Sequence, residues 1–169
     1  LVDIATYVCD YRIKHRTAFV AARTCLMDAL ACAVEALEHP ECTKLLGPSV
    51  PGASLRNGAR VPGTSFELDP ATAAFNIGTL VRWSDFSDTF TAAQGTHPSD
   101  NVAGILATAD YLSRRRVPER REPLLMKDVL ESLVKAYEIQ GCLAIENDFN
   151  AVRVDHIILA KVATAAVVT

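Results

Sequence analysis

The residues whose types could support chemistry gather in one turn-rich stretch, residues 82–101. It holds Asp85, Asp88, Thr89 and His97 between two apolar segments. If the helix predicted before it continues for one more turn, the two carboxylates and Thr89 are spaced i, i+3 and i+4 and share a face. Carboxylates, a hydroxyl and an imidazole in one place are typical of acid–base catalysis.

The residues around His97 favour an accessible imidazole rather than one packed in the core. Pro98 forces the residue before it out of the α region and into an extended conformation. Ser99 and Asp100 are both good caps for the helix predicted from Asn101. The positive end of that helix dipole favours a neutral imidazole, and its free N–H groups could hold an anion. An alternative stays open, in which His97 is an ordinary loop histidine and the two carboxylates are turn residues.

The rest of the chain predicts an all-α domain of six or seven helices with one long irregular loop. Apolar residues recur at helical spacing in several segments. The expected helices cover residues 2–9, 18–37, 71–83, 101–114, 126–141 and 157–169, with a short helical turn at 41–46. The loop, residues 47–70, is rich in proline and glycine and includes a brief extended piece near 60–66. Small residues such as Gly104 let another backbone or a ligand come close to the helix 101–114.

The amino-acid composition argues against several classes of binding partner. The net charge is -3 and the pI about 5.8, which argues against a nucleic-acid-binding surface. The arginines at 114–116 and 120–121 are expected in a solvated connection between helices. We expect no membrane-spanning stretch and no signal peptide. The five cysteines are scattered without a Cys-x-x-Cys pair, which favours reduced thiols over a zinc or iron–sulfur site.

Two blocks of sequence, residues 73–89 and 97–112, resemble the MmgE/PrpD family. Shorter matches in the same order extend the resemblance over essentially the whole chain, at residues 42–48, 61–64, 68–70, 138–142 and 155–156. The resemblance implies that residues 1–169 are the first part of the family's large helical domain, truncated at both ends and without its smaller α/β lid. The missing start methionine and the absence of a helix stop signal near Thr169 favour the same expectation.

The resemblance also implies a function: a cofactor-independent hydro-lyase, without a metal, that converts 2-methylcitrate to 2-methyl-cis-aconitate in propionate catabolism (the methylcitrate cycle). It implies that Asp85, Thr89, His97 and His156 line the active site, with Asp88 beside them. From the residues alone, His156 opens an apolar helix and has a core or cap role by default. The implied partners are a small tricarboxylate and, at full length, a second copy in a homodimer, with no nucleic acid or membrane. The implied location is the cytoplasm, or the mitochondrial matrix in a eukaryote.

Three functional interpretations remain at this point. Residues 90–96 depart from the family pattern by lacking an acidic and aromatic pair, so the substrate stays open. Decarboxylation of cis-aconitate or epimerisation of an amino-dicarboxylate are alternatives to dehydration, and a non-catalytic helical module is a third possibility. Cationic groups that could bind carboxylates are few, so we expect residues 1–169 to be inactive by themselves.

Overall fold

Seven α-helices account for most of the chain. The computed structural model describes all of residues 1–169. The helices are α1 (Val2–Asp10), α2 (Arg16–Ala36), α3 (Pro40–Thr43), α4 (Pro70–Arg82), α5 (Asp100–Arg116), α6 (Met126–Glu146) and α7 (Ile157–Val168), with 3-10 turns at Val117–Glu119 and Asn150–Val152. The only sheet has two short strands, β1 (Ala59–Arg60) and β2 (Glu67–Leu68). The expected all-α class is confirmed.

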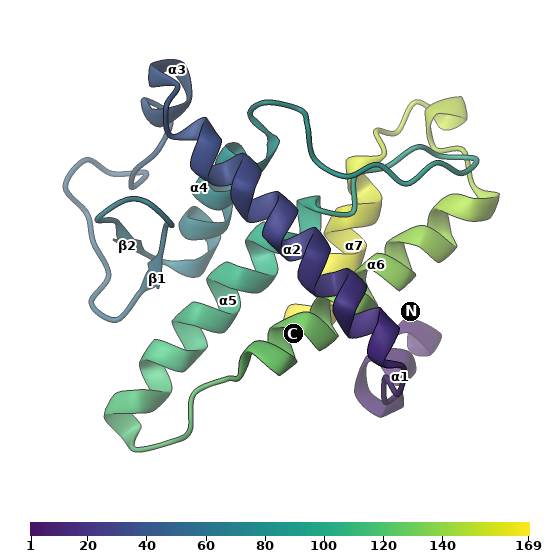
Figure 1. The fold of residues 1–169 in the computed structure, drawn as a ribbon, viewed down its shortest axis with the longest axis horizontal. Helices are drawn as coiled ribbons and strands as arrows, with labels where there is room; N and C mark the ends of the chain where they lie inside the picture. The colour runs from purple at the N-terminus through teal and green to yellow at the C-terminus, as the bar shows by residue number, and fades with distance from the viewer.

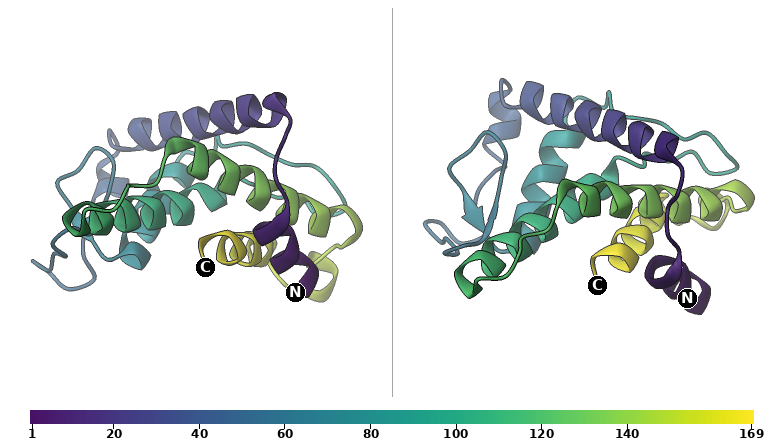
Figure 2. Two further views of the ribbon diagram at one scale, coloured as in Figure 1. Left: turned by 90° about the horizontal axis from the view of Figure 1, so that it is seen from below. Right: turned by 60° about the horizontal axis from the view of Figure 1, so that its bottom comes forward.

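The long helices lie in layers around one core. α2 crosses one side of α4 and α6, while α7 packs against α5 and α6 from the other side (Figures 1 and 2). α1 lies beside α7, so the two chain ends are close together (Figure 2). The buried cluster at the centre draws on α2, α4, α5 and α6, and includes Leu26, Ile77, Val102 and Leu133. Because α5 contacts α4, α6 and α7, it fixes the relative positions of residues near its ends.

α2 is long and apolar enough, by length and composition alone, to cross a membrane. The expectation that the chain has no membrane-spanning stretch stays a prediction, because this test uses length and composition alone and Arg23 and Asp28 interrupt the apolar run. One such helix near the N-terminus is weak grounds for a membrane span, because core helices pass the same test. Its buried residues share one face: Ala22, Leu26, Ala29, Ala33 and Ala36. That face packs against α4 and α6, as in the core helix of a globular domain.

The long connection between α3 and α4 is anchored to the helices. β1 pairs antiparallel with β2 in a small hairpin. The extended piece expected near residues 60–66 is therefore misplaced, because most of that stretch is the turn between the two strands. The backbone N–H of Arg60 donates to Asp110 of α5 at 2.8 Å, and Arg114 of α5 pairs with Glu67. Three apolar side chains of the hairpin are buried in the main core: Ala59, Val61 and Leu68. The connection is thus part of the packed domain rather than a loose surface loop.

α4 begins where the sequence predicts. The carboxylate of Asp69 accepts backbone N–H groups from Ala71 at 3.1 Å and Thr72 at 3.0 Å, which are free in the first turn of any helix. Hydrogen bonds from Thr72 lower the pKa of Asp69. Pro70 occupies the first helical position, where no N–H is needed.

α4 ends earlier than the site prediction required. The helix stops at Arg82, and Asp85 has a φ of 54°, in the left-handed region. A residue in that region cannot continue a right-handed helix. The prediction that Asp85, Asp88 and Thr89 share a helix face at i, i+3 and i+4 is therefore wrong.

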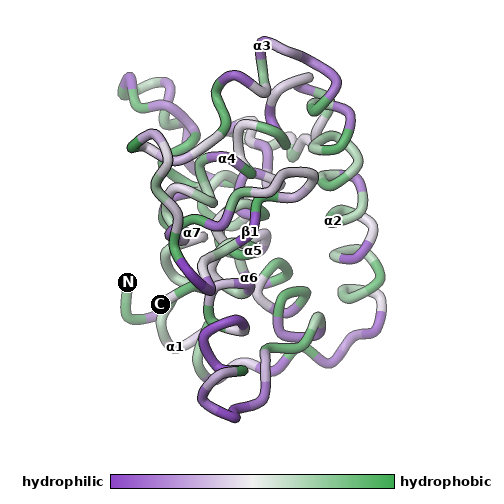
Figure 3. The backbone as a smooth tube through the Cα atoms, turned by 90° about the vertical axis from the view of Figure 1, so that its left-hand side faces the viewer, coloured by the Kyte–Doolittle hydropathy of each residue, from purple (hydrophilic) through white to green (hydrophobic).

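The basic residues that follow α5 lie at one extremity of the molecule. The polar connection between α5 and α6 forms the strongly hydrophilic lower end of the tube in Figure 3. Arg120 and Arg121 are exposed there, and Arg121 pairs with Glu119 at 3.4 Å. This placement confirms the expected solvated connection for Arg120 and Arg121. The expectation is wrong for Arg114–Arg116, which form the last turn of α5, where Arg114 pairs with Glu67.

All five cysteines are free thiols, in agreement with the prediction. Cys42 is buried, Cys25 and Cys32 are half-buried, and Cys9 and Cys142 are exposed. Burial raises the pKa of Cys42, which keeps that thiol in its neutral form.

Candidate active site

Two histidines that are far apart in the sequence meet at one end of α5 and α7. His97 lies in the connection that leads into α5, and His156 immediately precedes α7. Their ring centroids are 5.9 Å apart, and the ring planes are inclined by 56°. Two imidazoles at this spacing can exchange protons with neighbouring atoms of one small substrate. The structure therefore brings together both histidines of the predicted site.

A buried hydrogen-bond network holds α5, α6 and α7 in the arrangement that this pairing needs. Asn101 of α5 is fully buried and donates its amide N–H groups to Gln140 of α6 and to the carbonyl of Pro98, the latter at 2.9 Å. Its amide oxygen accepts the hydroxyl of Thr164 of α7 at 2.7 Å. Gly104 lies against the same threonine, which explains why a small residue stands there. The network was missed because its members are far apart in the sequence.

Asp88 fixes the position and the tautomer of His97. The backbone carbonyl of Asp88 lies 2.8 Å from Nδ1 of His97, and its carboxylate accepts the backbone N–H of Ser99 at 2.9 Å. A carbonyl oxygen can only accept, so Nδ1 carries the proton and the Nε2 of a neutral ring is free to accept one. Asp88 thus serves as the residue that orients His97.

His156 has a carboxylate rather than a carbonyl as its neighbour. Its Nδ1 lies 3.3 Å from a carboxylate oxygen of Asp155. The histidine side chain is 29% exposed and that of Asp155 is 71% exposed, so the pair lies at the edge of the site. A carboxylate in this position can stabilise an imidazolium that forms during proton transfer.

Asp85 and Thr89, the other two predicted site residues, are both exposed in this structure. The Asp85 side chain is mostly exposed and pairs with Arg82 at 3.0 Å. Thr89 is exposed, and its hydroxyl makes no hydrogen bond within the chain. No hydrogen bond or ion pair joins either residue to His97 or His156, so their catalytic roles stay predictions.

Arg82 and Asp100 form an ion pair beside the histidines that the sequence analysis did not foresee. Nε of Arg82 lies 3.3 Å from Oδ1 of Asp100, and the same guanidinium also pairs with Asp85 and donates to Ser87. The Asp100 side chain is only 6% exposed. Burial raises the pKa of Asp100, an effect opposed by the charges of Arg82, His97 and His156. The two residues are distant in sequence, and no local spacing rule predicts their contact.

Gln94 ties the connection that carries His97 to the one that carries His156. Its side-chain oxygen accepts backbone N–H groups from Phe149 at 3.0 Å and Asn150 at 3.3 Å. Its own backbone N–H donates to the carbonyl of Ala144, near the end of α6. Gln94 is buried and lies within the segment 90–96, where this sequence departs from the family pattern.

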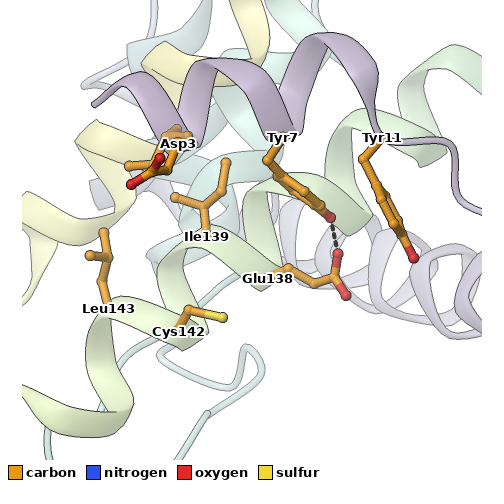
Figure 4. A pocket seen from close by; sticks show the side chains of 8 residues that line it. Asp3, Tyr7, Tyr11, Glu138, Ile139, Cys142 and Leu143 are labelled. Carbon is orange, nitrogen blue, oxygen red and sulfur yellow. Dashed lines mark hydrogen bonds between the residues drawn. The ribbon is translucent and has the colours of Figure 1, made fainter.

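No group of three or more histidine, cysteine or acidic side chains is arranged to hold a metal ion. A separate cavity between α1 and α6 is lined by neither histidine. Its volume is about 500 Å³, and the Tyr7 hydroxyl donates to Glu138 there (Figure 4). Its remaining walls are mostly apolar, with Ile139 and Leu143 on the α6 side (Figure 4). This cavity contains no acid–base pair comparable to the two histidines.

Comparison with known proteins matches nearly the whole chain. A family model described as the MmgE/PrpD N-terminal domain matches residues 2–169. The 2-methylcitrate dehydratase of Cupriavidus necator is 60% identical over 168 residues, which cover 99% of this chain and 35% of that protein. The 2-methylcitrate dehydratase of Escherichia coli (strain K12) is 58% identical over the same shares. The mitochondrial 2-methylcitrate dehydratase of Yarrowia lipolytica is 49% identical over 99% of this chain and 32% of that protein.

The chain spans about a third of the length of the curated relatives that it matches. The match extends from α1 through α7 and includes the segments that carry His97 and His156. The family model and the relatives therefore agree over nearly the whole chain. This chain belongs to the MmgE/PrpD N-terminal domain family.

Proposed function

We propose that this chain supplies the acid–base groups of a 2-methylcitrate dehydratase, a hydro-lyase that forms 2-methyl-cis-aconitate. The observation that carries the proposal is the pair of imidazoles 5.9 Å apart, His97 and His156. Relatives named 2-methylcitrate dehydratase, 58–60% identical to this chain, support the choice of substrate.

The hydrogen bonds of the two histidines suggest a division of roles. His97 has a free Nε2 because its Nδ1 faces a carbonyl oxygen, so it is suited to remove the carbon-bound proton. His156 has Asp155 beside it and is suited to protonate the departing hydroxyl. In this step a C–H bond and a C–O bond break, the C–H electron pair forms the double bond, and water leaves. The reaction involves no net oxidation or reduction.

The activity of the whole protein is also part of this proposal, because the chain spans about a third of its relatives' length. Within the chain, Arg82 already pairs with Asp85 and Asp100, so few cations remain for a tricarboxylate. We expect further anion-binding groups to come from other parts of a full-length enzyme. We also infer a place in propionate catabolism, assembly as a homodimer, and a cytoplasmic or mitochondrial location, the last because one relative is described as mitochondrial.

The proposal is tested with the full-length gene product and 2-methylcitrate, following the ultraviolet absorbance of the unsaturated product. We expect His97→Ala to lower kcat by roughly 10²–10⁴-fold, the usual contribution of a general base. The thermal midpoint should fall by only a few degrees, because His97 is half-buried and loses one hydrogen bond, to the carbonyl of Asp88, worth about 1 kcal/mol. His15→Ala is the matched control, since His15 is exposed and its side chain makes no capping hydrogen bond. The proposal would be refuted if the His97→Ala variant kept the activity of the wild type. It would also be refuted if the wild-type protein had no dehydratase activity.

A further inference from the structure

A second cavity opens directly beside the histidine pair, between the first turn of α5 and α7. Its volume is about 360 Å³. Six residues line it: Asp100, Ile157, Ala160, Lys161, Thr164 and Ala165. His156 and Ala160 are four residues apart around the start of α7, so a ligand in this cavity lies on the face that also carries His156.

The α5 side of the cavity ends in an incompletely bonded carboxylate. The Asp100 side chain is 94% removed from solvent, and Oδ1 faces the guanidinium of Arg82. Oδ2 has no hydrogen-bond partner in the chain. A buried carboxylate oxygen without a partner is costly, so a native structure is expected to provide one. Asp100 lines the cavity, so a ligand hydroxyl there can supply the partner once the carboxylate turns toward it.

The α7 side of the cavity offers a free cation. Lys161 is exposed and makes no ion pair or side-chain hydrogen bond within the chain. Arg82, the other cation near the histidines, is already bonded to Asp85, Asp100 and Ser87. Lys161 is therefore the group best placed to pair with a ligand carboxylate.

The wall between these two polar ends is apolar. Ile157, Ala160 and Ala165 supply it, and the two alanines leave space instead of filling it. Such a wall suits a small alkyl group, because its side chains carry no hydrogen-bonding groups. The cavity thus presents a cation, an unpaired carboxylate oxygen and an apolar surface to one ligand.

We propose that this cavity is the subsite that recognises the alkyl-bearing end of the substrate. Lys161 pairs with a substrate carboxylate, Oδ2 of Asp100 accepts a hydrogen bond from the substrate hydroxyl, and the wall at Ala160 and Ala165 receives the methyl substituent. This inference rests on the proposed function, since it assigns the ligand as an alkyl-substituted hydroxy-tricarboxylate. It makes Lys161 an affinity determinant and Ala165 a specificity determinant.

The first test measures binding of 2-methylcitrate to the full-length gene product by isothermal titration calorimetry. A His97→Ala background prevents turnover during the titration. We expect Lys161→Met to weaken binding roughly 10–100-fold, as for the loss of a charge-assisted hydrogen bond. Lys127→Met is the matched control, because Lys127 is an exposed lysine in the first turn of α6. Equal affinities of the Lys161 and Lys127 variants would overturn the proposal.

The second test compares 2-methylcitrate with citrate, which lacks only the methyl group. Ala165→Leu fills the wall, so we expect it to reduce the affinity ratio of 2-methylcitrate to citrate by about 10-fold, the scale of a lost methyl pocket. Ala31→Leu, at an exposed position of α2, is the control. A ratio that stays at the wild-type value in the Ala165 variant would overturn the assignment of the wall.

These binding measurements separate the subsite from the proposed reaction. If 2-methylcitrate binds in a Lys161-dependent way but no unsaturated product forms, the subsite is supported and the proposed function is refuted. If product forms but the Lys161 variant binds 2-methylcitrate with unchanged affinity, the proposed function is supported and the subsite is refuted. If the protein binds neither 2-methylcitrate nor citrate, both the subsite and the proposed function are refuted.

Discussion

The contact between Gly104 of α5 and Thr164 of α7 is tight enough to predict the effect of a single added methyl group. A Cβ built on Gly104 would lie 2.5 Å from Cγ2 of Thr164, closer than real Cβ atoms come to a neighbour. Thr164 cannot move freely, because its hydroxyl donates to Asn101 and its β-branched side chain has few rotamers. Gly104→Ala must therefore separate the two helices or break that hydrogen bond.

The expected magnitude follows from two opposed effects. Overpacking a well-packed contact costs about 1–3 kcal/mol. Replacing glycine by alanine inside a helix returns about 1 kcal/mol. Gly78→Ala in α4 gives the matched control, because its Cβ would meet Ala103 at an ordinary 3.6 Å and only the helix-propensity gain remains. Gly104→Ala should thus be less stable than Gly78→Ala by about 1–3 kcal/mol.

Urea-induced unfolding, followed by circular dichroism, measures the difference. A double variant, Gly104→Ala with Thr164→Ser, sharpens the test because serine keeps the hydroxyl and removes the clashing methyl. We expect it to recover most of the lost free energy of unfolding. Equal stabilities of the Gly104→Ala and Gly78→Ala variants, or no recovery in the double variant, would show that the packing argument is wrong.

Three further predictions concern single polar groups. Asp69→Ala removes the cap of α4 and should lower the free energy of unfolding by about 0.5–2 kcal/mol at neutral pH. Because the pKa of Asp69 is lowered on folding, this loss should disappear in urea titrations as the pH falls below the ordinary carboxyl value of about 4. Thr164→Val leaves the buried amide oxygen of Asn101 without its donor and should cost about 1–3 kcal/mol, measured in the same way; a neutral result would contradict the network. Folding raises the pKa of Asp100, so its contribution favours the fold below the unfolded pKa and is lost as the pH rises through the folded value. Asp100→Asn should therefore gain stability relative to wild type across that rise, and a constant difference between their unfolding free energies would exclude the effect.

The helices could be predicted because their signals are local. The apolar periodicity of α2 and α6 and the Asp69 cap of α4 lie within a few residues of the structure that they specify. The early end of α4 could not be predicted in the same way. The backbone turns at Asp85, which has a positive φ, and no glycine or proline stands there to mark the end of the helix in the sequence.

The residues of the candidate site also differ in whether a local sequence signal predicts them. His97 stood out from its own neighbours, Pro98 and the helix that follows. His156 had no local signal and was identified by the family resemblance alone. The Arg82–Asp100 pair and the Asn101–Gln140 hydrogen bond depend on the packing of separate helices, so only the structure could reveal them.

The bonds made by Gln94 join two surface connections into one cooperative unit. Releasing the segment 147–156 strips Gln94 of both its donors, and releasing the segment 90–96 leaves the backbone amides of Phe149 and Asn150 without an acceptor. Local opening of either segment therefore also costs the two hydrogen bonds that join it to the other. The distance between the two imidazoles is in this way protected against the independent fluctuations that surface loops usually undergo, and amide hydrogen exchange at Phe149 reports on the integrity of the whole site.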